Sequence, residues 1–154
     1  MFFIIESPNG TTTSLRVRKA IDHPNNPWHL RYLGQPEIGD RNRATLVRNC
    51  IDCSTSPNIL QFLMDMGFQM DFEFVLKGYM FRKGRMKVIV AKMFRLIQPG
   101  SLDNLEPIST SYLVELSVVA PSGQDKLADE IKQFAEQLKP LVQLEKIDPR
   151  SCLK

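Results

Sequence analysis

Two short runs rich in strand-forming apolar residues predict a β-hairpin near the start of the chain. The runs are residues 2–6 and 15–21, and the segment between them contains Asn9 and Gly10. Because Asn and Gly tolerate the positive φ angles of tight hairpin turns, this segment favours a turn between two antiparallel strands.

Five later runs have the residue types and the spacing of β-strands. They are residues 29–34, 45–52, 68–81, 86–97 and 109–120, with loops expected at 37–43 and 98–107.

Two of these runs, residues 68–81 and 86–97, flank the sequence RKGR, in which Gly84 favours a turn, so they predict a long hairpin. Its first strand has large apolar side chains on both faces. One face carries Phe72, Phe74, Leu76 and Met80, and the other carries Val75, Tyr79 and Phe81. A strand with one face in water would alternate cleanly, so we expect both faces to pack, as in a barrel wall covered by a helix or a partner.

Two segments have helical periodicity. In the first, Ser56 fits an N-cap, Pro57 the first helical position and Gly67 a left-handed C-terminal cap. In the second, Ser122 and Asp125 resemble a capping box. The apolar stripes expected to face the core are Ile59, Phe62, Leu63 and Met66 in the first helix, and Leu127, Ile131, Phe134 and Leu138 in the second.

These patterns together predict an α+β fold: an antiparallel, barrel-like curled sheet of about seven strands with two flanking helices. The length of 154 residues predicts a single domain over residues 1–154. The hydrophobic fraction of 43% and the charged fraction of 24% are typical of a globular protein. No apolar run approaches the length of a membrane helix, and the three cysteines suggest reduced thiols in the cytosol or nucleus.

Catalytic and cofactor motifs are missing from the sequence, and we predict no catalytic residue, metal site or cofactor. Neither of the common glycine-rich nucleotide-binding motifs occurs. Cys50 and Cys53 have C-x-x-C spacing, but on a strand they would point to opposite faces and could not share a zinc ion. The chain is therefore predicted not to be an enzyme.

A metal-dependent triphosphatase is the first alternative. Asp71, Glu73 and Lys77 lie on one strand face and resemble the E-x-E-x-K strand of the triphosphate tunnel enzymes, with one acid changed and Val75 in place of the lysine. Carboxylates on neighbouring positions could hold a divalent cation. The solvated side of an ordinary strand has the same appearance.

An RNA-binding module is the second alternative. Arg82, Lys83, Arg85 and Lys87 gather at the hairpin tip, and aromatic residues lie nearby. Aromatic platforms edged with cations stack single-stranded bases. However, the net charge is only +3, which is low for a nucleic-acid-binding domain. A solvated hairpin tip explains the same residues, so we expect no direct nucleic-acid binding.

Several long segments resemble the animal form of subunit eighteen of the Mediator complex. They are "PWHLRYLGQPEIGDRNRATLVRNCID", "FLMDMGFQMDFEFVLKGYMFRKGRMKV", "SYLVELSVVAPSGQD" and "FAEQLKPLVQLEKIDP". The resemblance runs from about Phe2 to Pro149. Members of that family carry a further N-terminal strand and helix, so the resemblance implies that this chain lacks them.

This resemblance implies a nuclear, non-enzymatic subunit of the Mediator head module that serves RNA polymerase II indirectly. It implies pairing with subunit twenty, capture of a helix of subunit eight, and a fold akin to the triphosphate tunnel enzymes without their activity. Aromatic side chains are enriched at interface centres, and an arginine such as Arg31 could anchor a partner at the interface rim. The residues expected to bind partners are therefore Trp28, Arg31, Tyr32, Tyr79 and Phe81. Trp28 equally fits a plug inside the barrel.

Overall fold

The computed structural model describes residues 1–6, 8–37, 45–124 and 126–146, and their secondary structure is α+β. The chain divides into two compact units. The first comprises Met1–Pro36, Arg48–Phe74 and Arg95–Leu105, and the second comprises Glu37–Val47, Val75–Phe94 and Glu106–Lys154. The division falls inside three continuous strands, so the single-domain organisation stays a prediction.

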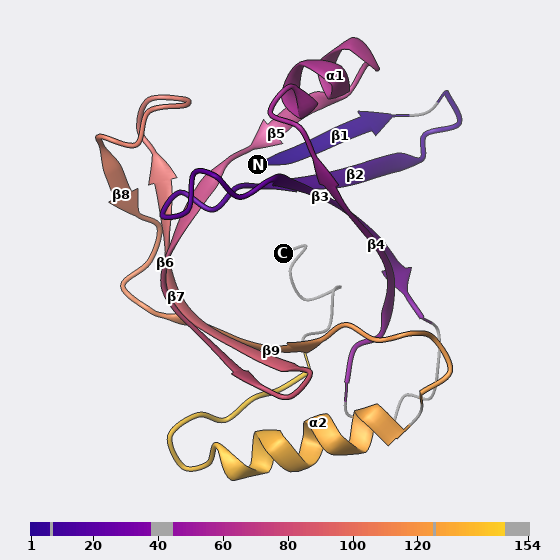
Figure 1. Cartoon of the computed structure of the whole chain (residues 1–154), viewed down its shortest axis with the longest axis vertical. Coiled ribbons are helices and arrows are strands. Elements are labelled where there is room, and N and C mark those ends of the chain that lie inside the picture. The colour runs from indigo at the N-terminus through magenta and orange to yellow at the C-terminus, as the bar shows by residue number, and fades with distance from the viewer. Residues whose placement is uncertain (7, 38–44, 125, 147–154) are drawn as a thin grey trace. The chain divides into compact units, whose positions relative to one another are not determined.

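A five-stranded antiparallel sheet forms the first unit (Figure 1). Its strand order is β4, β3, β2, β1 and β5. The bounds are β1 Phe2–Glu6, β2 Thr12–Arg18, β3 Trp28–Pro36, β4 Arg48–Thr55 and β5 Gln69–Phe72.

The predicted β1–β2 hairpin is confirmed, with Phe3 opposite Leu15. Gly10 has the expected positive φ of 77°. Asn9 does not share it; its side-chain Oδ1 instead accepts a hydrogen bond from the Thr11 N–H at 3.2 Å, which shapes the turn.

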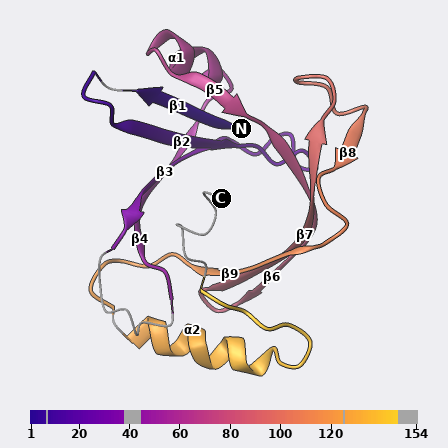
Figure 2. The same ribbon diagram turned by 180° about the vertical axis from the view of Figure 1, so that it is seen from behind.

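Helix α1 (Ile59–Asp65) covers one face of this sheet and contacts β5, as Figure 2 shows from behind. Its C-terminal cap is as expected: Gly67 has a φ of 90°, and the Phe68 N–H donates to the Leu63 carbonyl at 2.9 Å. The N-terminal prediction is wrong by two residues, because Asn58 is the N-cap and Ser56 bonds to its side chain.

The core of the first unit lies between α1 and the sheet. Its buried members are Phe3, Val17, Ile59 and Leu63. The apolar stripe predicted for α1 is therefore only half right, since Phe62 and Met66 are more than half exposed.

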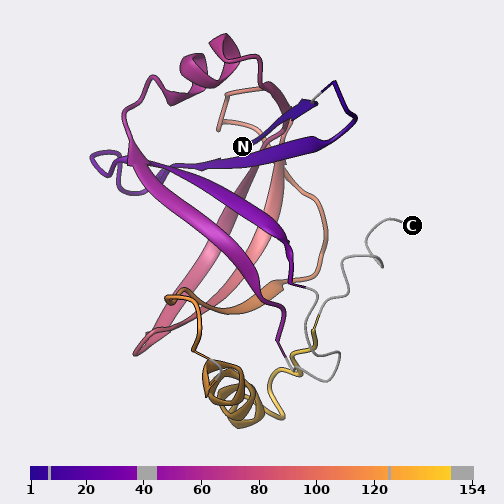
Figure 3. The same cartoon turned by 90° about the vertical axis from the view of Figure 1, so that its right-hand side faces the viewer.

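A four-stranded antiparallel sheet and a helix build the second unit. Its long hairpin is seen along its length in Figure 3. β7 pairs with β6 and β8, and also with β9, where Val88 lies opposite Leu116. The bounds are β6 Phe74–Lys83, β7 Met86–Leu96, β8 Leu105–Pro107, β9 Leu113–Val118 and α2 Lys126–Gln137.

The α+β class, the antiparallel pairing and the two helices are confirmed. The expected single curled sheet of about seven strands is wrong. The described residues form nine strands in two sheets, and these do not close into one sheet. Two strands were missed because the run 68–81 breaks at Glu73 into β5 and β6, and because β8 lies in the expected loop 98–107. The loop expected at 37–43 and the capping residue Asp125 fall almost wholly outside the described residues.

The stripe predicted for α2 is half-buried at all four positions, as expected for a helix packed on a sheet: Leu127, Ile131, Phe134 and Leu138.

Gly78 marks a close approach between β6 and β7. A Cβ atom there would lie 2.1 Å from the Val90 carbonyl oxygen and 2.5 Å from the Ala91 Cα. Gly78→Ala is therefore expected to lower the free energy of unfolding by about 1–3 kcal/mol, as measured by urea denaturation. Gly34→Ala is the control, because its nearest neighbour would be the Asn49 carbonyl oxygen at an ordinary 3.4 Å. Equal losses in both variants would contradict this explanation.

Candidate functional site

Strand β6 presents two strongly exposed aromatic side chains in the second unit. Tyr79 is 75% exposed and Phe81 is 57% exposed. They lie on one face of the strand with their ring centroids 6.4 Å apart, and Met80 on the other face is 59% exposed. Large apolar side chains gathered in water on both faces of a strand are typical of a surface that another protein covers.

Trp28 is placed differently, against the core of the first unit. It is half-buried at the start of β3 and packs on the cluster that contains Phe3 and Leu63. The Lys19 ammonium covers its outer side, 5.2 Å from the ring centroid. Most of its surface is therefore used in packing, and its role in partner binding stays a prediction.

Tyr32 shares the sheet face of Trp28 but lies beyond the core, where it is 38% exposed. Its cross-strand neighbour on β4 is Ile51, which is 66% exposed. Ile51 was not among the predicted partner-binding residues, although it alternates with Cys50 and Asp52 on a strand. Tyr32 and Ile51 form an apolar pair on the surface of the first unit.

Arg31 projects from the opposite face of β3 and is held there by Asp52. The two residues are directly opposite each other in the β3–β4 register. The guanidinium donates two hydrogen bonds to the carboxylate, from Nε to Oδ1 and from Nη2 to Oδ2. The Arg31 side chain is 19% exposed and that of Asp52 is 40% exposed. Two parallel hydrogen bonds fix the orientation of the Arg31 guanidinium. A partner protein that contacts Arg31 would therefore contact the Asp52 carboxylate as well.

This pair predicts a pH dependence of stability. The hydrogen bond from Arg31 holds the pKa of Asp52 below its ordinary value of 3.8, and partial desolvation opposes the shift. A folded-state pKa below the unfolded one stabilises the fold above pH 3.8, and this contribution is lost as pH falls through the folded pKa.

Asp52→Asn is therefore expected to cost less than about 1 kcal/mol near neutral pH, because the carboxylate is partly in solvent. The difference from wild type should vanish in acid below the folded-state pKa. Urea denaturation from neutral pH into acid measures this, and a difference that grows as pH falls would contradict the assignment.

The cysteines and histidines do not assemble a metal site in the described part of the chain. Cys50 lies opposite Leu33 and Cys53 opposite Leu30, which places the two thiols on opposite faces of β4 as predicted. His23 is exposed, 3.8 Å from Asp22. The described residues contain no group of three His, Cys, Asp or Glu side chains that could hold a metal ion, and none of their helices is long and apolar enough to cross a membrane.

The acidic pattern behind the triphosphatase alternative is split between two strands. Asp71 is in β5 and Lys77 in β6, with Glu73 at the break. The Glu73 carboxylate accepts a hydrogen bond from the Gly100 N–H at 2.9 Å, and the Lys77 ammonium lies over the Phe94 ring, 5.2 Å from its centroid. The structure does not bring the three charged groups onto one strand face.

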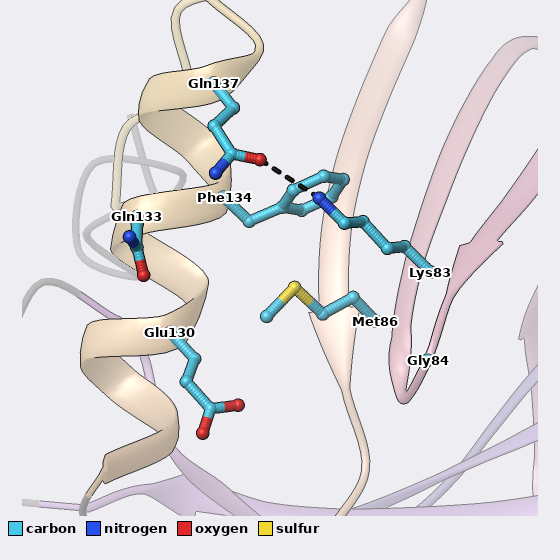
Figure 4. A pocket seen from close by; sticks show the side chains of 7 residues that line it. All are labelled: Lys83, Gly84, Met86, Glu130, Gln133, Phe134 and Gln137. Carbon is cyan, nitrogen blue, oxygen red and sulfur yellow. Dashed lines mark hydrogen bonds between the residues drawn. The ribbon is translucent and has the colours of Figure 1, made fainter.

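The cations at the β6–β7 turn hold helix α2, which weakens the RNA-binding alternative. Lys83 Nζ donates to the Gln137 side-chain oxygen at 3.0 Å and lies 4.7 Å from the Phe134 ring centroid (Figure 4). Arg85 donates to the Gln124 side-chain oxygen at 2.7 Å and lies 4.0 Å from Glu130. An open cavity of about 260 Å³ remains beside these contacts. Two of the four cations at the tip thus have structural partners in α2.

The comparisons with known proteins identify the family. The family model described as "Med18 protein" matches residues 5–152. The "Mediator of RNA polymerase II transcription subunit 18" of Xenopus tropicalis is 58% identical over 151 residues, which cover 98% of this chain and 73% of the relative. The protein of the same name from Danio rerio is 55% identical over 153 residues (99% and 74%), and that from Caenorhabditis elegans is 32% identical over 144 residues (90% and 62%).

A solved structure agrees in fold. A chain of the Schizosaccharomyces pombe Mediator head module superposes with a TM-score of 0.71 at 14% identity, covering 95% of this chain and 82% of that one. At this identity the match supports the fold alone, whereas the family model and the closely similar vertebrate sequences extend over nearly the whole chain. The chain belongs to the Med18 protein family.

Proposed function

We propose that this chain is a non-enzymatic subunit of the Mediator head module and a coregulator of transcription by RNA polymerase II. The observation that carries the proposal is the 58% identity to a Mediator subunit over 98% of the chain. The match in fold to a chain of the fission yeast head module agrees with it. A subunit of this complex works in the nucleus and needs surfaces for neighbouring subunits.

Its partners are other Mediator subunits, and the proposal extends to subunit twenty and to a helix of subunit eight. The surfaces proposed for them are the aromatic face of β6, with Tyr79 and Phe81, and the exposed pair of Tyr32 and Ile51. Trp28 and Arg31 belong to the proposal as supporting residues, since one packs on the core and the other is paired with Asp52. Kinship with the triphosphate tunnel fold also stays a proposal.

Co-expression with subunits twenty and eight of the same species tests the proposal. We expect a stable ternary complex that elutes as one species in size-exclusion chromatography, with the mass of the three chains by light scattering. A folded chain that joins neither subunit, nor any other head subunit, would overturn it.

A further inference from the structure

A second hollow in the second unit combines two lysines with three aromatic rings. Its volume is about 360 Å³, which is within the range of ligand pockets. It lies over β6, β7 and the segment before β9, and is lined by Lys77, Gly78, Tyr79, Lys92, Phe94 and Tyr112.

Each lysine is positioned by a ring. The Lys77 ammonium lies 5.2 Å from the Phe94 centroid, and the Lys92 ammonium lies 4.9 Å from the Tyr112 centroid. Cation–π contacts restrict the flexible lysine chains, so less conformational entropy is lost when an anion binds.

The hollow has two positive charges and no negative one in its lining. Within the residues that the structure describes, no carboxylate forms an ion pair with Lys77 or Lys92. The rings of Tyr79 and Tyr112, 75% and 62% exposed, offer apolar area as well as phenolic hydrogen-bond donors. The complementary ligand is therefore anionic and apolar at once.

We propose that this hollow binds an acidic segment of a partner protein in which Asp or Glu alternates with large apolar residues. The carboxylates bind Lys77 and Lys92, and the apolar side chains cover Tyr79 and Tyr112. This proposal rests on the proposed function as a protein-binding subunit, and it specifies the charge and polarity of one partner segment.

A peptide fits these groups better than RNA does. Affinity for a phosphate backbone grows with the number of cations placed along it. The hollow supplies two, and two further cations on the same hairpin already have partners in α2: Lys83 binds Gln137, and Arg85 lies beside Glu130. A peptide with two carboxylates needs no more than the two cations of the hollow. Its apolar side chains can also contact Phe81, which lies beside Tyr79 and extends the apolar surface.

Fluorescence anisotropy on the whole chain tests the proposal. The probe is a short fluorescein-labelled peptide in which Asp alternates with Phe and Leu. Lys77→Gln with Lys92→Gln is expected to weaken its binding about tenfold, the loss of two partly exposed charge pairs. Lys126→Gln with Lys132→Gln on α2 removes the same charge elsewhere and should leave the affinity within about twofold. Tyr112→Leu, which keeps both lysines, should also weaken binding.

Three results would overturn the proposal: no binding of the peptide, equal losses in both lysine variants, or tighter binding of an oligouridine with loss in the same hollow variant. A peptide with Lys in place of Asp should not bind. Because these measurements use the isolated chain, a negative result is distinguishable from failure of the co-expression with head subunits.

Discussion

Replacing Leu63 with alanine is expected to lower the free energy of unfolding by about 2–5 kcal/mol. The Leu63 side chain is 2% exposed and joins α1 to Phe3 and Val17 of the sheet. Truncation removes apolar contacts and leaves a cavity that the surrounding strands cannot easily fill. Urea denaturation followed by tryptophan fluorescence measures the loss, because Trp28 is the only tryptophan and packs against this cluster.

Phe62→Ala is the matched control on the same helix. Phe62 precedes Leu63 directly but is 54% exposed, so the substitution is expected to cost less than about 1 kcal/mol. A loss at Phe62 as large as that at Leu63 would mean that α1 packs on the sheet through a different face.

Helix α1 shows which buried positions the spacing of apolar residues in the sequence can predict and which it cannot. The spacing of Ile59 and Leu63 predicted the buried face correctly. It could not tell that Phe62 and Met66 lie outside the contact, since a helix of seven residues meets the sheet along a narrow line. The N-cap was misplaced for a local reason: Ser, Pro and Asn are all suited to a helix start, and the structure uses the last of them.

Strand pairing was harder to predict than strand existence. The sequence from 68 to 81 reads as one strand, yet Phe72 pairs with Phe2 in one sheet while β6 pairs with β7 in the other. The break at Glu73 depends on which distant strands are available, and this is not encoded in local alternation. Local hairpins such as β1–β2 were therefore predictable, whereas the division into two sheets was not.

The features of the candidate site were likewise only partly predictable from the sequence. Tyr79 and Phe81 are exposed in the structure, since large apolar residues on both faces of one strand exceed what one core can cover. Their role on a binding surface stays a prediction. Arg31 was expected at an interface rim, but its carboxylate partner is Asp52, 21 residues further along the chain. Only the β3–β4 register brings the two together.

Replacing both Tyr79 and Phe81 with alanine is expected to weaken binding to the head subunits at least thirtyfold, roughly 2 kcal/mol. The reason is that two adjacent aromatic rings supply most of the apolar area on this face of β6, and aromatic residues at interface centres carry a large share of binding free energy. Co-expression with subunits eight and twenty, followed by titration of the purified chains, measures the change.

Met80→Ala separates the two faces of β6. Met80 lies between the two aromatics in sequence, points to the other side of the strand and is 59% exposed. If the partner covers only the aromatic face, Met80→Ala leaves the affinity within about threefold of wild type. If the partner covers both faces, Met80→Ala and the Tyr79 and Phe81 double variant both bind more weakly. Wild-type affinity in the Tyr79 and Phe81 double variant, with circular dichroism showing a folded chain, would remove this face from the interface.

Because all three side chains are mostly in solvent in the isolated chain, none of these substitutions should change its stability by more than about 1 kcal/mol, so a change in binding reports on the surface itself.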